Sequence, residues 1–509
     1  MNSHTIARNS FWFGLETVVG LVSGVVTSII IARALGPVKL GHYTYIAWLV
    51  SITASVGALG VPAATFKYMG EYLGRGEAAL AKAIFISTFR LQATIASILT
   101  VVAVSVAWFG ADHDMRWTAA ALAAAMWPAM VNAIPSQANM ANENLVANVP
   151  GALVSNAIYV GGVILTLSFS RSTLGLAITL LTMRTAELLI RVGPVLRWME
   201  SIPHAEVPVD IRRRLFAFSR QSTVLLLLSI IVWDRSEVIF LRYLTDIRQL
   251  AFYTVVFNVT ERLRSVPQAF STAVGATMMA QFGRNQRALL DVFGTSVRYL
   301  LFFCAPIHVG LSLLSGPVIT LTYGSKYLPA IPLMAMASLL ALPRVVLTPV
   351  NTLLAATDKQ ALTVRLNLWM ALLNIGLDVL LIRHYGAMGA VIANGLSQTI
   401  AAICLYWLAS NALSFHFPWI DLVKVLGVSA AMTASVLVVP STSSLLLDLL
   451  ARTGVGAAVY ILGVRATRLL AKPDGRRLLQ LGARFPSALR SAFNRGVQFL
   501  VPSLGAVGL

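Results

Sequence analysis

Leu40-Gly41-His42-Tyr43-Thr44 recurs as Leu250-Ala251-Phe252-Tyr253-Thr254, about 210 residues further along the chain, and each copy joins two long apolar segments. The register persists beyond these motifs, because residues 74–80 align with residues 283–289 and Ser87 aligns with Ser296. In a membrane protein, a repeat of this length predicts two homologous helical lobes with a cleft between them. Such a cleft is the usual place for a transport pathway.

The composition indicates a membrane protein. Of 509 residues, 57% are hydrophobic and 12% are charged, and the mean hydropathy is +0.77. A soluble chain has about 25% charged residues. The basic residues behind the net charge of +19 lie in short loops and a basic tail. This distribution is typical of charge that sets the orientation of a membrane protein, so we favour this explanation over nucleic-acid binding. Cys304 and Cys404 lie in apolar segments without metal or redox spacing, so we expect small core residues.

A transmembrane helix needs about 20 apolar residues, and this length predicts an all-α membrane protein with fourteen spans. The first span has no small-residue cleavage site after it, so we expect an uncleaved helix rather than a signal peptide. The spans lie near 9–35, 40–66, 79–109, 115–137, 145–169, 173–197, 215–243, 250–281, 292–321, 328–354, 361–384, 387–410, 419–440 and 445–470.

The repeat assigns six spans to each lobe, so the two lobes enter the membrane from the same side. The predicted organisation is an N-terminal lobe, a linker, a C-terminal lobe, an additional helix pair and a basic amphipathic tail, at 1–200, 201–214, 215–410, 411–470 and 471–509. An amphipathic helix on anionic lipid explains the tail, and a docking site for a protein is the alternative.

Positive charge predicts the orientation. With the N-terminus inside, cytoplasmic segments carry about 24 Lys and Arg, six of them between Arg191 and Arg220, and the opposite side carries about nine. This asymmetry predicts that both termini are cytoplasmic.

Charged residues inside spans are costly, so they tend to face a cavity or one another. Asp234 and Glu237 share one face of their span, and the next span carries Glu261-Arg262-Leu263-Arg264. Arg184 and Glu187 form a similar pair. Internal ion pairs without a functional role are the alternative for each of these residues. The predicted intramembrane charges are Arg90, Arg184, Arg235, Arg262, Arg264 and Arg344, with Glu16, Glu187, Asp234, Glu237, Glu261 and Asp378.

Motifs of enzymes are missing from the sequence. The seven histidines have no ligand spacing, no phosphate-binding glycine loop follows a strand, and no outer loop is large enough for a saccharide polymerase or ligase. We therefore expect no catalytic residues, no metal and no cofactor.

Four motifs resemble those of one family. Arg33-Ala34-Leu35-Gly36-Pro37, followed by Gly41-His42-Tyr43, resembles the first-loop signature of bacterial polysaccharide exporters. Three others follow in the same order: Trp233-Asp234-Arg235, Gly386-Ala387-Met388-Gly389-Ala390, and Lys472-Pro473-Asp474. Over nearly the whole chain, the sequence resembles the O-antigen and lipid-linked oligosaccharide flippases of the multidrug and polysaccharide exporter superfamily. One departure is Thr245-Asp246, which stands where the first repeat has Gly36-Pro37.

The resemblance implies a V-shaped pair of six-helix bundles in the bacterial inner membrane, with alternating access. The implied cargo is an undecaprenyl-diphosphate-linked oligosaccharide, and a diphosphate suits arginine forks. The substrate-binding candidates, in order, are Arg184, Arg262, Arg264, Arg235 and Arg90, and the ion-coupling candidates are Asp234, Glu237 and Glu261.

The implied partners are the lipid-linked oligosaccharide, a coupling H⁺ or Na⁺, membrane lipids, a polysaccharide polymerase and a chain-length regulator. The alternatives are a cation-coupled multidrug exporter and a flippase for the peptidoglycan lipid precursor. An exporter of organic cations would need more acids than arginines in its lumen, and the intramembrane charges are balanced in number.

Overall fold

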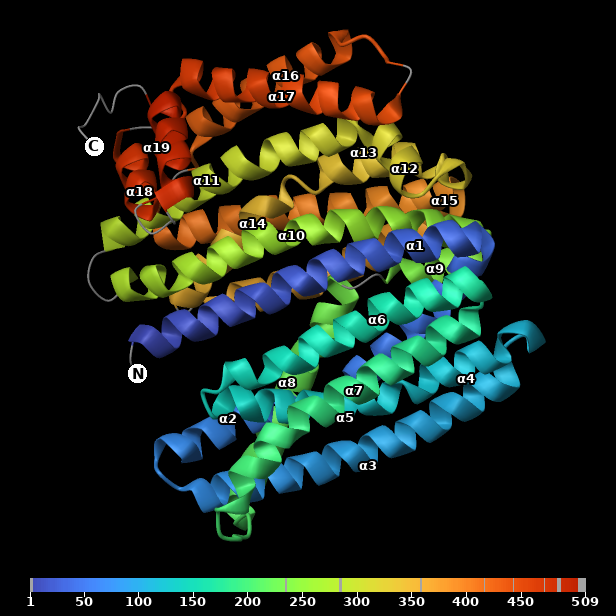
Figure 1. Cartoon of the computed structure of the whole chain (residues 1–509). Coiled ribbons are helices and arrows are strands. Elements are labelled where there is room, and N and C mark those ends of the chain that lie inside the picture. The colour runs from blue at the N-terminus through green and yellow to red at the C-terminus, as the bar shows by residue number, and fades with distance from the viewer. Residues whose placement is uncertain are drawn as a thin grey trace. The chain divides into compact units, whose positions relative to one another are not determined.

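The computed structural model describes residues 3–233, 236–282, 286–357, 359–415, 417–442, 444–470, 472–482 and 487–501. Within these ranges the chain is helical and contains no strand (Figure 1). Ten of the described helices are long and apolar enough to cross a membrane. Large apolar side chains point outward, among them Phe109 and Phe169, which are 84% and 86% exposed. Lipid is the environment in which such a surface is stable.

The described residues form two compact units, of which the first contains residues 1–258 and 378–387. Its helices are α1 (Ser3–Gly57), α2 (Val61–Gly74), α3 (Ala78–Gly110), α4 (Arg116–Ala124), α5 (Met126–Ala141), α6 (Val149–Phe169), α7 (Thr173–Glu200), α8 (Val209–Trp233), α9 (Glu237–Leu244) and the start of α10 (Ile247–Phe282). Helices α3 to α7 lie side by side in Figure 1, and α6 packs along both α1 and α7. Short 3₁₀ turns at His113–Met115 and Leu145–Asn148 connect neighbouring helices.

A glycine divides α1 into the two predicted spans. Gly36 has a φ of 70°, a left-handed conformation that breaks the helix before Pro37. Five residues later the second half of α1 approaches α10 closely. A Cβ on Gly41 would lie 2.4 Å from the backbone oxygen of Ile247, so only glycine fits there. The backbone conformation at Gly36 and the close approach at Gly41 explain both glycines of the first-loop motif.

The corresponding turn of the second repeat has a different construction. Thr245 is extended, and Asp246 accepts a hydrogen bond through Oδ1 from the backbone N–H of Arg248 at 2.8 Å. An aspartate turn thus stands where the first repeat has a left-handed glycine, which accounts for the departure seen in the sequence.

The second unit contains residues 259–377 and 388–509. Besides most of α10, it has α11 (Gln286–Leu313), α12 (Ser315–Thr322), α13 (Ala330–Leu340), α14 (Arg344–Ala356), α15 (Gln360–Leu413), α16 (Trp419–Val438), α17 (Leu445–Thr467), α18 (Lys472–Gly482) and α19 (Ser487–Leu500), with a 3₁₀ turn at Ser325–Tyr327. Helix α11 packs against α13, α14 and α16, and α16 packs against α17.

A second left-handed glycine divides α15. Gly386 has a φ of 56°, and the backbone N–H of Ala387 donates to the side-chain oxygen of Gln249 at 3.2 Å. Residues 378–387, which include this break, belong to the first unit. The break separates the predicted eleventh and twelfth spans, as the glycine-alanine motif indicates.

Several predicted spans are broken where the sequence analysis expects one helix. The second span ends at Gly57, because Leu59 and Gly60 adopt positive φ angles of 47° and 65° before α2 begins. Other predicted single spans consist of the pairs α4 and α5, α11 and α12, and α13 and α14. Between α8 and α9 lie residues 234 and 235, which are outside the described residues. The tail forms two described helices, α18 and α19.

Helices α8 and α9 pack within the first unit, although the repeat assigns them to the second lobe. The Arg214 guanidinium of α8 lies 3.4 Å from the Glu71 carboxylate of α2. At the other end, the hydroxyls of Tyr45 in α1 and Tyr243 in α9 are 3.2 Å apart. The division into two six-helix lobes stays a prediction.

Candidate functional site

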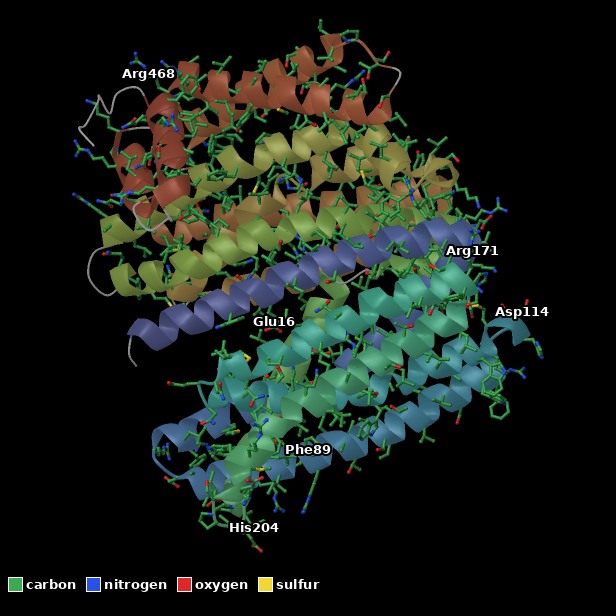
Figure 2. All side chains as sticks on the ribbon, in the orientation of Figure 1. Glu16, Phe89, Asp114, Arg171, His204 and Arg468 are labelled. Atoms are coloured by element: carbon green, nitrogen blue, oxygen red, sulfur yellow. The ribbon has the colours of Figure 1, made fainter. Side chains whose placement is uncertain are left out.

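Four charged side chains of α1 and α7 form one ion-pair network in the first unit. Arg191 lies between two acids, with Nη2 at 3.0 Å from Glu16 Oε1 and Nη1 at 2.9 Å from Glu187 Oε1. Arg184 Nη1 is 3.2 Å from the other oxygen of Glu187. Figure 2 labels Glu16 on the first half of α1. We call Glu16, Arg184, Glu187 and Arg191 the first-unit network. Its two arginines and two glutamates balance in formal charge.

Arg191 is the fixed centre of this network. Its side chain is only 11% exposed, and its backbone oxygen accepts a hydrogen bond from Asn139 Nδ2 at 3.1 Å. A Cβ on Gly151 would lie 2.8 Å from Arg191 Cγ, so α6 must carry glycine at this position. Such enclosure holds the guanidinium between its two carboxylates and joins α1 to α7.

The sequence analysis counts Arg191 among the basic residues of a cytoplasmic segment, which stays a prediction, and the structure adds that this side chain is buried. Helix α7 continues to Glu200, and Arg191 is buried within it. The spacing held the relevant signal, because residues 184, 187 and 191 recur at intervals of three and four and therefore share one helix face.

Arg184 is the more accessible arginine of the network. Its side chain is 40% exposed and contacts one oxygen of Glu187. Arg184 also acts electrostatically on Tyr159, which is hydrogen-bonded to Tyr43. If Arg184 moved to a ligand, Glu187 would keep Arg191 as a partner. Exchange of Arg184 therefore leaves no acid of the network unpaired.

The second unit holds a different set of charges, built around Glu261. Arg264 forms an ion pair with Glu261 one helical turn away, and Arg344 Nη1 lies 3.6 Å from Glu261 Oε2. Arg262 is exposed and Arg264 is 45% exposed, whereas Arg344 is 14% exposed. We call Glu261, Arg262, Arg264 and Arg344 the second-unit cluster. Arg262 belongs to this set by its position next to Glu261 in the sequence, and the four residues together have a formal charge of +2.

Arg344 enters this cluster because its span is broken. The helical path from Ala330 to Ala356 is interrupted at 341–343, and Arg344 begins α14 directly after Pro343. The sequence analysis counts Arg344 among the intramembrane charges but does not select it as a candidate. Its contact with Glu261 joins residues far apart in the sequence, which spacing along one helix does not reveal.

Two buried acids of the first unit interact electrostatically. Glu237 and Asp378 are 1% and 0% exposed, and their carboxyl groups interact electrostatically. Ser236 Oγ donates a hydrogen bond to Asp378 Oδ2 at 3.4 Å. The sequence analysis counts both residues among the intramembrane charges but does not connect them. The two residues lie about 140 positions apart, and only the tertiary fold brings them together.

The remaining candidates are separate from these groups. Arg90 is exposed on α3, and the ion pairs of the described residues do not include it. Arg298, one position out of register with Arg90 in the second copy of the repeat, binds Asp474, with Nη2 at 2.8 Å from Oδ1. Asp234 and Arg235 lie outside the described residues. In the part of the chain that is described, no three His, Cys, Asp or Glu side chains are arranged to hold a metal ion.

Comparison with known families identifies relatives in polysaccharide biosynthesis. A family described as "Polysaccharide biosynthesis protein" matches residues 30–332, more than half of the chain. The "Probable low-salt glycan biosynthesis flippase Agl15" of Haloferax volcanii is 21% identical over 168 residues, which are 32% of this chain and 36% of that protein. The chain thus matches about a third of the length of this curated relative.

Solved structures share the fold at low sequence identity. The lipid II flippase MurJ in an inward closed conformation superposes with a TM-score of 0.72 at 15% identity, covering 89% of this chain and 97% of that chain. An inward-facing multidrug resistance transporter of the MATE family, in the MOP superfamily, has a TM-score of 0.65 at 14% identity, covering 77% and 94%. The fold is therefore that of MOP-superfamily transporters, and the protein is a multi-pass membrane protein.

Proposed function

The chain belongs to the polysaccharide biosynthesis protein family, and we propose that it moves an undecaprenyl-diphosphate-linked oligosaccharide across the bacterial inner membrane. The cargo passes from the inner to the outer leaflet by alternating access of the two predicted lobes. The protein acts as a transporter and forms no covalent bond with the cargo. Its O-antigen, capsule or exopolysaccharide repeat unit is supplied by glycosyltransfer and is consumed by a polymerase with its chain-length regulator.

The observation that carries the proposal is the excess of arginine in the second-unit cluster. A diphosphate carries adjacent anionic oxygens, which a planar guanidinium can bind two at a time. Arg262 and Arg264 are exposed enough to contact such a group, while Arg344 keeps Glu261 paired. Intramembrane charges are costly, so a set of residues with a formal charge of +2 suits a site that receives an anion.

In the first unit, Arg184 is the residue that we assign to the cargo. Its exposure and its retained neighbour Arg191 allow it to leave Glu187 without stranding that acid. Arg90 and Arg235 complete the proposed substrate-binding set. Arg191 itself is assigned to structure, because two carboxylates already enclose its guanidinium.

Ion coupling is a second part of the proposal, with H⁺ or Na⁺ as the coupling ion. We assign Asp234, Glu237 and Glu261 to it, and the electrostatic interaction between the buried acids Glu237 and Asp378 supports Glu237. Two carboxyl groups that meet in a low-dielectric interior favour uptake of a proton or a cation between them. Glu261 has two arginine neighbours, so it would exchange only when cargo draws an arginine away.

The decisive experiment measures flipping by purified protein in liposomes. A fluorescent undecaprenyl-diphosphate oligosaccharide is placed in one leaflet, and its appearance in the other leaflet is detected with an impermeant lectin. The same oligosaccharide on an uncharged polyprenyl ether serves as the matched control cargo. We expect transport of the diphosphate-linked oligosaccharide and not of the ether-linked control. Equal transport of both would contradict a role of the arginines in binding the diphosphate.

The acid pair Glu237 and Asp378 keeps the multidrug exporter as a second candidate, since buried acids also suit organic cations. The liposome assay separates the two functions when ethidium replaces the oligosaccharide. Ion-driven ethidium uptake without oligosaccharide flipping would favour the exporter. Flipping of the peptidoglycan lipid precursor, measured in the same assay, tests the remaining alternative, a flippase for that precursor.

The direction of transport depends on the orientation of the chain. Ser201 and Ser325 are both exposed, and the predicted topology puts them on opposite sides of the membrane. In a variant with Cys304 and Cys404 replaced by alanine, Ser325→Cys should react with an impermeant maleimide in intact cells. Ser201→Cys should react only after the cells are opened, and the reverse pattern would invert the orientation.

A further inference from the structure

The C-terminal helices α18 and α19 are fixed to the second unit through one buried carboxylate. Asp474 is 1% exposed, and its Oδ1 accepts hydrogen bonds from Arg298 Nη2 and from Tyr299 Oη, both at 2.8 Å. Arg477 adds a contact from Nη1 to Thr295 Oγ1 at 3.5 Å. Helix α19 packs against both α18 and α17. The tail is therefore a packed part of the unit.

The same contacts place the tail at the edge of the membrane. Helix α16 has 20 residues, which at 1.5 Å per residue is about the 30 Å thickness of the hydrocarbon core. Asp421 in its first turn therefore lies near one boundary of that core, where Trp419 is 66% exposed as an interfacial aromatic residue. Arg298 Nη1 lies 3.9 Å from Asp421 Oδ2 while Nη2 binds Asp474, so α18 lies at the same level.

The end of α17, the helix that precedes the tail, is consistent with this position of α18 near the boundary of the hydrocarbon core. Helix α17 ends at Thr467, and Arg468, labelled in Figure 2, adopts a left-handed conformation there. Only four residues separate this end from α18, and Figure 1 shows α18 and α19 together at one end of the helices of the second unit. The tail therefore begins at the level that the length of α16 assigns to the lipid headgroups.

The exposed charge of the tail has one sign. From residue 472 to residue 501 the sequence contains a single acid, Asp474, and this acid is buried against Arg298. Apolar residues face the unit, because Val497 and Val501 are buried. The exposed basic residues of the described tail are Lys472, Arg476, Arg477, Arg490 and Arg495.

We propose that α18 and α19 form a binding surface for anionic phospholipid headgroups, with Asp474 holding it at the headgroup level. Basic amphipathic helices at a membrane surface attract anionic lipid and release it as salt rises. An acidic protein could meet the same charges, but the position beside the headgroups gives lipid continuous access. The proposal requires only that the chain spans a membrane, so it stands apart from the identity of the cargo.

The test measures which lipids gather around the tail in full-length protein. Cys304 and Cys404 are replaced by alanine, and the exposed Ser491 is replaced by cysteine and labelled with a donor dye. The protein is placed in nanodiscs of mixed phosphatidylcholine and phosphatidylglycerol that contain an acceptor-labelled trace of one lipid or the other. We expect at least about threefold more energy transfer to the phosphatidylglycerol tracer, declining toward equality in 1 M salt.

Charge variants separate this surface from a merely structural tail. Replacing Arg476, Arg477, Arg490 and Arg495 together by glutamine should abolish the preference, whereas replacing the same four by lysine should retain it. Asp474→Asn removes the negative charge that pairs with Arg298 and leaves the basic residues of the tail unchanged, so a reduced preference would support the fixing role. Size-exclusion elution checks the fold of each variant. The salt series on the unsubstituted tail needs no charge variant.

Equal energy transfer to both tracers at low salt would overturn the proposal and would favour an acidic protein as the partner. Unchanged preference in the glutamine variant would overturn it as well, because the exposed arginines would then be irrelevant. Flipping activity is not part of either readout, so failure here leaves the proposed transport intact.

Discussion

The first-unit network balances its charges, whereas the second-unit cluster has more arginine than glutamate. Arg191, at the centre of the network, is 11% exposed and lies between Glu16 and Glu187. Arg264, in the cluster, is 45% exposed and forms an ion pair with Glu261, which Arg344 also contacts. A buried and balanced set holds helices together, while an exposed and unbalanced set can receive an anionic ligand. Intramembrane charged residues thus have two roles, holding helices together and binding a ligand. Burial and the local balance of charge distinguish these roles.

The largest expected effect comes from the centre of the balanced network. Arg191→Ala leaves Glu16 without its arginine and removes one of two arginines from Glu187, so we expect a loss of about 3–5 kcal/mol in stability. Because a folded protein is stable by only about 5–15 kcal/mol, little protein should reach the membrane. Thermal aggregation in detergent and membrane yield measure the effect.

A matched variant separates charge from packing at this position. The double variant Arg191→Met with Glu16→Gln removes one charge of each sign, so it should recover a substantial part of the lost stability. Normal yield and melting of Arg191→Ala alone would contradict the structural assignment and would return Arg191 to the list of cargo ligands.

The next effect concerns transport through the second-unit cluster. Arg264→Ala removes an exposed guanidinium while Arg344 still pairs with Glu261, so the protein should fold normally. We expect flipping to decline by about 10- to 100-fold, the range of a lost charge-assisted hydrogen bond. Arg264→Lys should recover part of the rate, because lysine keeps the charge but loses the fork.

Arg90→Ala serves as the comparison for this prediction, since Arg90 is exposed and the described ion pairs do not include it. If Arg264→Ala transports at the normal rate while Arg90→Ala does not, cargo binding follows exposure on α3 rather than the unbalanced cluster. Both variants are measured at equal protein density in the same liposomes.

Much of the fold follows from local rules that a sequence displays. Apolar length predicts the spans, and the glycines at 36 and 386 mark the breaks that divide α1 and α15. The pairing of Arg184 with Glu187 is equally local, because three residues separate them on one helix face. The breaks at Gly60 and before Arg344 are harder to predict, since the flanking residues are as apolar as a continuous span.

Apart from the local pair of Arg191 with Glu187, the contacts that sequence reasoning missed join distant segments. Arg191 meets Glu16 across 175 positions, and Arg298 meets Asp474 across 176. Hydropathy and helical spacing describe one segment at a time and carry no information about which helices become neighbours. The roles assigned to the arginines and acids remain predictions for the same reason, because they depend on cargo and ion.

A smaller effect is expected at the buried acids. Glu237→Gln replaces an acid that interacts with Asp378, and it keeps the shape of the side chain. We expect flipping without a gradient to stay within about threefold of normal, and the acceleration by an imposed pH or sodium gradient to be lost. Asp234→Asn should behave in the same way. Flipping by the unsubstituted protein that ignores both gradients would leave these acids as structural residues.

The smallest effect, and the closest test of the comparison, is Glu16→Gln. Glutamine retains an oxygen that can accept the hydrogen bond from Arg191, and Glu187 remains as its anionic partner. Glu16 is 22% exposed, so the loss of stability should be only about 1 kcal/mol. The formal charge of the network then rises from 0 to +1, which brings it closer to the +2 of the second-unit cluster. If local charge balance decides which set receives the cargo, the apparent KM for the diphosphate-linked oligosaccharide should decrease by about two- to fivefold. Glu16→Ala is the control, since it removes the hydrogen bond as well as the charge and should lower stability further. A KM that rises in Glu16→Gln at normal melting temperature would show that the balanced network, and not the excess of arginine, is the arrangement that cargo binding requires.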